Sequence, residues 1–232
     1  VVFVHLIDEI GVVAQRDTYP GLGSYPTAFW RPDHTFKDVY RIAVPDTAYA
    51  PASLSLQVGL YSRDWTYRLE PSCGTPERAI ELQKLPLLPL AGELPNPQNV
   101  NWDNQIRLVG YQVEPRSVRP GEGMMFQFYW QIAHSPSVDY GTFLHVLGED
   151  GQIWAQYDAQ PAWPMETWPL NTPVEEKRYL IIPENVPAGS YQVKVGVWPI
   201  GESGRLLPIV ADDGHWIGDS LLLSRVRVLP LY

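Results

Sequence analysis

Two histidines at equivalent places in the chain are the residues whose types and spacing most suggest chemistry. His5 lies two positions after Phe3, and His145 lies two positions after Phe143. A metal site would need further ligands at suitable geometry, and one aspartate is all that recurs with each histidine. We therefore expect both imidazoles to be structural, each hydrogen-bonded to backbone or to a Gln or Asp of the neighbouring strand.

Other candidate catalytic and metal-binding groups are isolated. Asp212-Asp213-Gly214 and Glu149-Asp150-Gly151 offer oxygen ligands but lack the spacing of a calcium loop, and turn chemistry accounts for Asp-Gly. Glu175-Glu176 are neighbours on an expected strand and so point to opposite faces, whereas glycoside hydrolysis needs two carboxylates across a cleft. Cys73, the single cysteine, has no nearby histidine to lower its pKa. We expect no enzyme, no metal and no cofactor.

Aromatic side chains form the remaining candidate site. The chain has 9 Trp, and the flat faces of aromatic rings suit stacking against the apolar faces of sugars. The candidate platform consists of Tyr61, Trp163, Trp168 and Trp198. The alternative for Trp168 and its counterpart Trp30 is burial at the end of a β-sandwich core. Trp198 and Tyr61 lie on the polar faces of their expected strands, and so we expect them to be more exposed.

Composition limits the class of protein. The chain has 232 residues, 45% of them hydrophobic and 19% charged, which is sufficient for a buried core. Its formal net charge of −9 argues against nucleic acid as a partner, because binding to phosphates needs clustered Lys and Arg. No apolar run approaches the roughly 18–20 residues that span a bilayer. The 23 prolines favour short strands joined by firm turns.

An internal repeat organises the chain. Val2–Asp17 is repeated as Thr142–Asp158, with an offset of 140 at the histidines (145 − 5) and of 141 at the final aspartates (158 − 17). The second copy thus has one additional residue, which we interpret as a β-bulge near Trp154. A repeat of this length predicts two copies of one module.

Alternation of apolar and polar residues predicts the strands. It is clearest in Ser53–Tyr61 and in Ser190–Trp198, where one face is apolar. Asp38–Val44 and Glu176–Ile182 are also expected strands, each ending at a proline. We predict an all-β protein of two tandem antiparallel immunoglobulin-like β-sandwich modules, residues 1–95 and 96–232, joined by a proline-rich connector.

The second module begins with two strands that the first lacks. Asn104–Val113 and Gly123–Ile132 have no counterpart before Val1, which already reads as part of a strand. We therefore expect an open edge on module 1, completed by a protein partner, by a neighbouring copy or by upstream sequence. Such upstream sequence is also where a membrane anchor would lie.

The second module resembles a known family. Pro187-Ala188-Gly189-Ser190-Tyr191 is similar to the tyrosine corner of immunoglobulin-like domains, although module 1 has Leu54 at the position of Tyr191. The other matching motifs are Gly110-Tyr111, Val118-x-Pro120-Gly121, Phe128-Tyr129-Trp130, Phe143-x-His145, Ala155-Gln156-x-Asp158 and Val195-Gly196-Val197. Together they resemble the repeated β-sandwich modules appended outside the membrane to bacterial multi-spanning glycosyltransferases and related surface proteins.

That resemblance implies a location and a class of function. It implies an extracytoplasmic, cell-surface module that is structural, adhesive or involved in assembly, and not catalytic. The alternative is a carbohydrate-binding accessory module of a membrane glycosyltransferase or a cell-wall enzyme, with a glycan as its ligand. The resemblance supplies no active-site residues.

Overall fold

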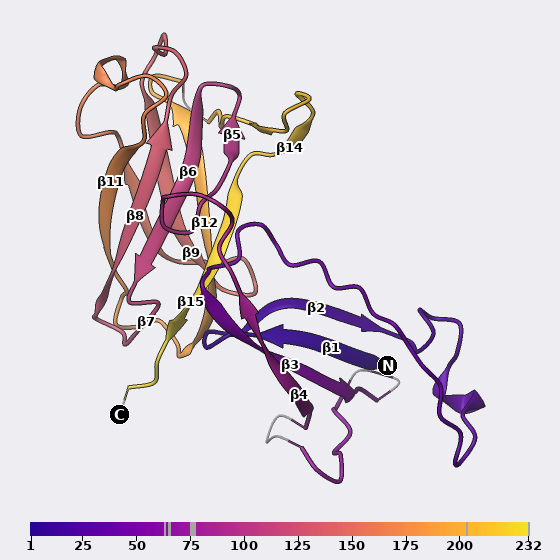
Figure 1. The fold of residues 1–232 in the computed structure, drawn as a ribbon. Helices are drawn as coiled ribbons and strands as arrows, with labels where there is room; N and C mark the ends of the chain where they lie inside the picture. The colour runs from indigo at the N-terminus through magenta and orange to yellow at the C-terminus, as the bar shows by residue number, and fades with distance from the viewer. Residues whose placement is uncertain (63, 65, 75–77, 203, 232) are drawn as a thin grey trace. The chain divides into compact units, whose positions relative to one another are not determined.

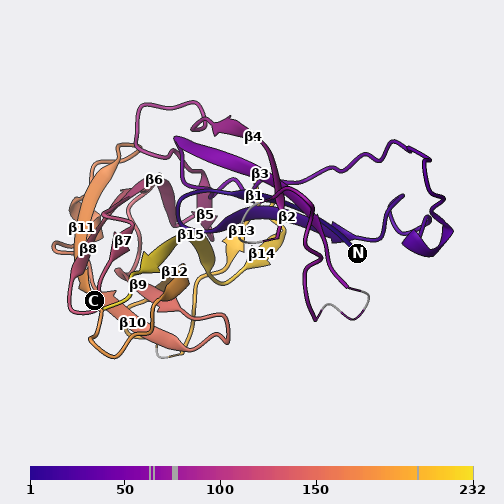
Figure 2. The same ribbon diagram turned by 90° about the horizontal axis from the view of Figure 1, so that it is seen from below.

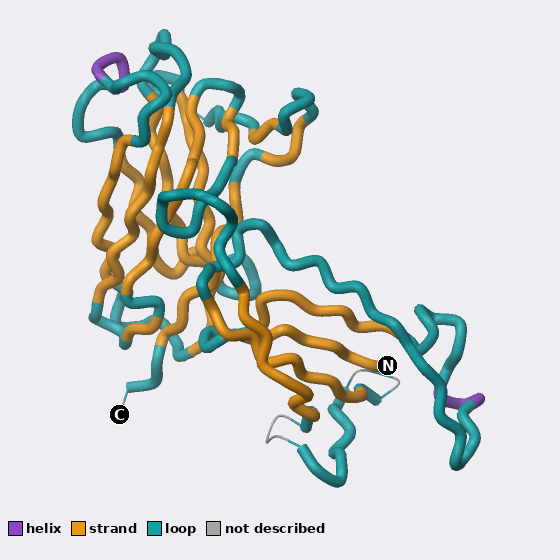
Figure 3. Tube along the Cα trace, in the orientation of Figure 1, coloured by secondary structure: helices purple, strands orange, loops and turns teal. Residues whose placement is uncertain are grey.

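The computed structural model describes residues 1–62, 64, 66–74, 78–202 and 204–231. It divides into two compact units, Val1–Leu88 and Pro89–Tyr232, and each is described by itself. The protein is all-β, with antiparallel sheets, as the alternation of the sequence predicts. Among the described residues the helical elements are two short 3₁₀ helices, η1 (Thr27–Phe29) and η2 (Met165–Thr167), which lie in long connections between strands (Figure 3).

The units divide inside the proline-rich connector, between Leu88 and Pro89, where we had placed the boundary near residue 95. The later part of the connector is tied to unit 2. The carbonyl of Pro95 accepts a hydrogen bond of 3.1 Å from the amide of Tyr111. A Cβ atom on Gly110 would lie 2.9 Å from the carbonyl oxygen of Pro95, so the absence of a side chain permits this close approach.

Unit 2 contains two sheets (Figure 1). The five-stranded sheet has the order β10 (Ile153–Ala159), β9 (Tyr140–Leu147), β12 (Gly189–Pro199), β15 (Leu221–Val228) and β7 (Ser117–Val118). The six-stranded sheet has the order β11 (Val174–Ile181), β8 (Gly123–Gln131), β6 (Ile106–Glu114), β5 (Val100–Trp102), β13 (Ile209–Val210) and β14 (Trp216–Gly218). Pairing is antiparallel throughout the two sheets except between β15 and β7.

The inward side chains of both sheets build the core of unit 2. On β8 they are aromatic, and Phe126, Phe128 and Trp130 are each at most 1% exposed. On β12 they are valines, and Val193 and Val195 are likewise at most 1% exposed. Burial of each large apolar side chain contributes about 1.5–3 kcal/mol, so these two strands supply much of the stability of the sandwich-like unit.

Unit 1 contains a four-stranded sheet with the order β2 (Val12–Thr18), β1 (Val2–Ile7), β3 (Ala52–Leu60) and β4 (Ile80–Leu87). Figure 2 shows the four strands as one layer. They correspond through the repeat to β10, β9, β12 and β15, in the same order. The described residues of unit 1 form no second sheet, and so the unit is the counterpart of one half of unit 2.

The predicted strand Asp38–Val44 is wrong, whereas its counterpart in unit 2 is confirmed as β11. Residues 38–44 belong to no sheet. The physical reason lies in the partner: β11 pairs with β8, and the described part of unit 1 has no strand equivalent to β8. A sequence with strand character cannot form a ladder without a second strand to accept and donate its hydrogen bonds.

The predicted bulge at Trp154 is confirmed, but the additional residue lies elsewhere. Trp154 is skipped between Ile153 and Ala155 in the pairing of β10 with β9. Val13 is skipped in the same way in β2, so both copies have the bulge. The added residue lies in the turn instead, where a hydrogen bond from Gly148 to Gln152 replaces the shorter closure from Asp8 to Gly11.

The predicted tyrosine corner of unit 2 is confirmed. The hydroxyl of Tyr191 donates a hydrogen bond of 2.6 Å to the carbonyl of Pro187. Burial raises the pKa of Tyr191, so the hydroxyl stays protonated and remains a donor. At the equivalent place in unit 1, Leu54 packs with Leu6 and Ala14 in the apolar cluster of the sheet.

Candidate functional site

The four aromatic residues of the predicted platform lie in three separate hollows. Trp163 and Trp168 line the same groove in unit 2, of about 240 Å³. Trp198 lines a second hollow of about 470 Å³ in the same unit. Tyr61 lines a hollow of about 690 Å³ in unit 1. The groove with two tryptophans combines them with charged and polar side chains, and it is the strongest candidate for a binding site.

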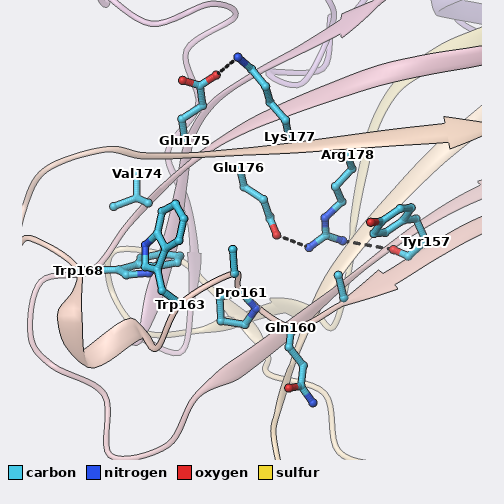
Figure 4. A pocket seen from close by; sticks show the side chains of 12 residues that line it. Tyr157, Gln160, Pro161, Trp163, Trp168, Val174, Glu175, Glu176, Lys177 and Arg178 are labelled. Carbon is cyan, nitrogen blue, oxygen red and sulfur yellow. Dashed lines mark hydrogen bonds and ion pairs between the residues drawn. The ribbon is translucent and has the colours of Figure 1, made fainter.

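The groove lies where an edge strand of one sheet meets an edge strand of the other. β10 ends the five-stranded sheet and β11 ends the six-stranded sheet, and the long connection after β10 closes the groove (Figure 4). Its lining residues are Tyr157, Ala159, Gln160, Pro161, Ala162, Trp163, Trp168, Val174, Glu175, Glu176, Lys177 and Arg178.

Local structure holds the two tryptophans in different environments. The side chain of Asp139 accepts a hydrogen bond of 2.8 Å from the amide of Met165, which anchors η2. Met165 is 1% exposed and Trp168 is 7% exposed, so the 3₁₀ turn directs both inward. Trp163 precedes the turn and stays 56% exposed, which leaves its ring available to a ligand. Tyr157, on β10, is 40% exposed and supplies a second aromatic ring.

Arg178 lies behind the groove and connects the two edge strands (Figure 4). Its side chain is 2% exposed. One terminal nitrogen donates to the carbonyls of Thr142, at 2.9 Å, and of Tyr157, at 3.2 Å. The other donates to the Thr142 hydroxyl and, at 2.7 Å, to the carboxylate of Glu176. The guanidinium also lies 5.6 Å from the centre of the Tyr157 ring, within reach of a cation–π interaction.

The charged residues of β11 alternate between the two faces, as the period of a strand requires. Glu176 points inward, where one oxygen binds Arg178 and the other accepts a hydrogen bond of 2.7 Å from the indole of Trp130. Glu175 points outward and forms a salt bridge of 2.8 Å with Lys177. That hydrogen-bonded carboxylate raises the pKa of Lys177. In contrast to this outward pair, both oxygens of Glu176 accept hydrogen bonds from buried side chains.

The two other hollows have different linings. Beside Trp198, Glu202 and Arg205 form an ion pair of 2.7 Å on an exposed loop. In unit 1, the hollow of Tyr61 includes Trp30, which is 38% exposed although its counterpart Trp168 is 7% exposed. The prediction that these two tryptophans are core residues is thus confirmed for Trp168, while Trp30 lacks an equivalent cover.

Both repeated histidines are hydrogen-bonded to the repeated aspartates, as predicted. His5 lies 3.0 Å from Asp17, and His145 lies 3.1 Å from Asp158. Burial lowers the pKa of His5 although the nearby carboxylate of Asp17 opposes that shift. Among the described residues no group of three His, Cys, Asp or Glu side chains could hold a metal ion.

Sequence reasoning did not identify Arg178 or Tyr157 as site residues. A signal was present, since Arg178 occupies an inward position of an alternating strand, where an arginine needs several acceptors. The acceptors come from β9 and β10, which are remote in sequence. Only the packing of the two sheets brings these groups together.

Comparisons with known proteins give little further information. No family model matches the chain, and no curated protein matches it. A solved structure titled as the crystal structure of the C-terminal domain of wzt is similar, with a TM-score of 0.40 and 11% sequence identity, over 57% of this chain and 78% of that one. In the described part of the chain no helix is long and apolar enough to cross a membrane.

Proposed function

We propose that this chain is a non-catalytic, adhesive module of an extracytoplasmic protein and that it binds a glycan at the β10–β11 groove. The observation that carries the proposal is the pair of exposed rings, Trp163 and Tyr157, in a groove whose base is the hydrogen-bonded pair of Arg178 and Glu176. A sugar offers an apolar face to such rings and hydroxyl groups to nearby polar side chains. Gln160 is the polar side chain at the rim, since the ion pair of Glu175 with Lys177 lies on the outer face of β11 (Figure 4).

Preorganisation supports binding over catalysis. Arg178 and Glu176 bind each other, and the two terminal nitrogens of Arg178 also bind groups on β9 and β10, so they hold the groove in shape before a ligand arrives. A general acid or base must be able to exchange a proton with the substrate. Glu176 is poorly placed for that task because both of its oxygens already accept hydrogen bonds.

The same proposal includes the immunoglobulin-like class of the fold and the cellular location of the protein. The tyrosine corner at Tyr191 favours an immunoglobulin-like sandwich for unit 2, with unit 1 as a partial copy. The resemblance to modules appended to membrane glycosyltransferases favours the cell surface. An adhesive role and an accessory carbohydrate-binding role are compatible, since adhesion can act through a glycan.

Retention of the full chain on a glycan array tests the proposal. We expect binding to at least one glycan, and we expect Trp163→Ala to weaken it by at least about tenfold, because aromatic anchors dominate binding energy. The control is Trp216→Ala, since Trp216 is 63% exposed on β14 and lies outside the groove.

Three results would contradict the proposal. If no glycan retains the chain, the structural role alone stands. If Trp198→Ala abolishes retention while Trp163→Ala does not, the ligand lies in the hollow of Trp198 instead. Equal losses for Trp163→Ala and Trp216→Ala would indicate non-specific adsorption.

A further inference from the structure

Unit 1 contains an extended segment that has the side-chain pattern of a strand but no partner. Residues 36–44 correspond to β11 and the residue after it, with an offset of 138 (174 − 36). Alternate residues are more buried in both, beginning with Phe36 in one and Val174 in the other. In β11 the last inward residues are fully buried, whereas in residues 36–44 all inward residues remain partly exposed.

The segment is held in place by its inward side chains. Ile42 and Val44 pack against the apolar cluster of the sheet in unit 1. Phe36 lies against Trp30, with ring centres 5.1 Å apart. Asp38 accepts hydrogen bonds from the amide of Gly21, at 2.8 Å, and from the hydroxyl of Tyr40, at 2.6 Å. These contacts fix which face of the segment points outward.

The backbone of the segment nevertheless pairs with no strand in the described part of the chain, where the one side-chain bond to its amides joins Val39 to Asp38, at 3.0 Å. Among the described residues, those from 36 to 44 make no backbone-to-backbone hydrogen bond. In unit 2 the eight residues Val174–Ile181 of β11 are all in register with β8. An ordered, extended backbone without ladder hydrogen bonds is a template for the addition of a strand.

Two properties of the segment define the chemistry of the strand that would pair with it. In unit 2 the residues of β8 that face the core opposite β11 are large and apolar: Met124, Phe126, Phe128 and Trp130. On the outward face of the segment, Lys37 and Arg41 form no ion pair among the described residues, and Val39 between them is 66% exposed. Opposite charges across an antiparallel pair are favourable.

We infer that residues 36–44 accept an amphipathic, acidic β-strand from a polypeptide outside residues 1–232. The strand lies antiparallel to the segment, with apolar side chains toward the sheet of unit 1 and carboxylates opposite Lys37 and Arg41. This inference is independent of glycan binding, because the β10–β11 groove and the acceptor segment belong to different units.

Synthetic peptides with the sequence of residues 104–132 provide the probe, because that segment contains β8. By the register of β11, Tyr129 of the peptide lies opposite Lys37 and Met125 lies opposite Arg41. An acidic peptide carries Met125→Glu and Tyr129→Glu, and a matched basic peptide carries lysine at both places. Hydrogen exchange of the full chain is measured with each peptide added. It reports the protection of the amides of residues 36–44 and, separately, of the amides of β11.

We expect the acidic peptide to protect residues 36–44 and to bind at least about fivefold more tightly than the basic one. The surface double variant Lys37→Glu, Arg41→Glu should reverse that preference without changing exchange in unit 2. No protection of residues 36–44 by either peptide would overturn the inference, as would protection of β11 alone or a preference that the double variant leaves unchanged. Dimers in sedimentation without peptide, with residues 36–44 protected, would overturn it in favour of a second copy.

Discussion

At the scale of single residues, the repeat preserves the residues of one packed cluster together with their contacts. Phe3 lies over Gly59 and Phe143 lies over Gly196, so that a Cβ on either glycine would collide with the ring. Each phenylalanine also contacts the histidine two residues later, with ring centres 4.8 Å apart in unit 1 and 4.5 Å apart in unit 2. The His–Asp hydrogen bond therefore belongs to a packed cluster, which supports a structural role.

The pKa of His5 predicts a pH dependence of unit 1. Burial holds the folded pKa below 6.5, so as the pH falls the unfolded chain takes up this proton first. The stability that His5 contributes is present above about pH 6.5 and is lost as the pH falls toward the folded pKa. Urea unfolding at pH 7.5 and at pH 5.5, monitored by the hydrogen exchange of amides in β1, should show a lower free energy of unfolding of unit 1 at pH 5.5.

His5→Gln is the control for that prediction. Glutamine does not titrate, so the variant should be less stable at pH 7.5 but should lose less on acidification than the parent. If both proteins lose the same stability between the two pH values, other groups are responsible and the assignment to His5 is wrong.

The corner of unit 2 allows a second prediction at this scale. Tyr191→Phe removes the hydroxyl that donates to Pro187 and leaves the ring in place. We expect the free energy of unfolding of unit 2 to fall by about 1 kcal/mol, the net contribution of a typical hydrogen bond. Chemical denaturation of the variant and the parent measures this, and identical midpoints would refute the contribution of the corner.

At the scale of elements, β11 shows how one strand can serve both the core and a surface groove. Its inward face carries Leu180 into the core and Arg178 against β9 and β10. The hydrogen bonds of Arg178 join the edges of the two sheets. Residues 36–44 have the same alternation but Asp38 and Tyr40 in the places of Glu176 and Arg178.

Arg178→Leu should therefore destabilise unit 2 strongly. The change leaves Glu176 without its cation and the carbonyls of Thr142 and Tyr157 without these donors. Removal of one member of a buried pair costs about 3–5 kcal/mol, and we expect about 3 kcal/mol because Glu176 is 21% exposed. Lys177→Ala, one residue away but on the outer face, should leave the denaturation midpoint unchanged. Similar losses of stability for the two variants would show that the buried hydrogen bonds of Arg178 contribute no more to stability than an exposed charge does.

At the scale of the whole molecule, the two units differ in how completely each buries the apolar face of its sheet within itself. Unit 2 has two sheets that bury each other, whereas the described part of unit 1 has one sheet with one extended segment across it. Stability rises with the apolar area removed from water. Unit 1 should consequently be the less stable part of the chain.

Hydrogen exchange of the native full chain tests this at matched positions. We expect amides of β1 to exchange at least about tenfold faster than the equivalent amides of β9, which corresponds to about 1.4 kcal/mol. Peptides that cover Leu6 and Val146, two buried residues on equivalent strands, provide the comparison. Equal protection would mean that unit 1 needs no further strand, and would count against the acceptor role of residues 36–44.

The sequence by itself determined the features that depend on local order along the chain. The alternation in the strands that became β3 and β12 and the corner at Tyr191 follow from residues close to one another in sequence. Periodicity and turn chemistry are local properties, and so they can be read without a structure.

Only the tertiary structure decided which segments find partners. Residues 38–44 and β11 share the pattern of a strand, but one has β8 beside it and the other does not. The groove of Trp163 likewise depends on the meeting of β10 with β11, and Arg178 is placed there by acceptors on β9 and β10. Pairing and burial are properties of two surfaces in contact, and the pattern of one segment does not specify its partner.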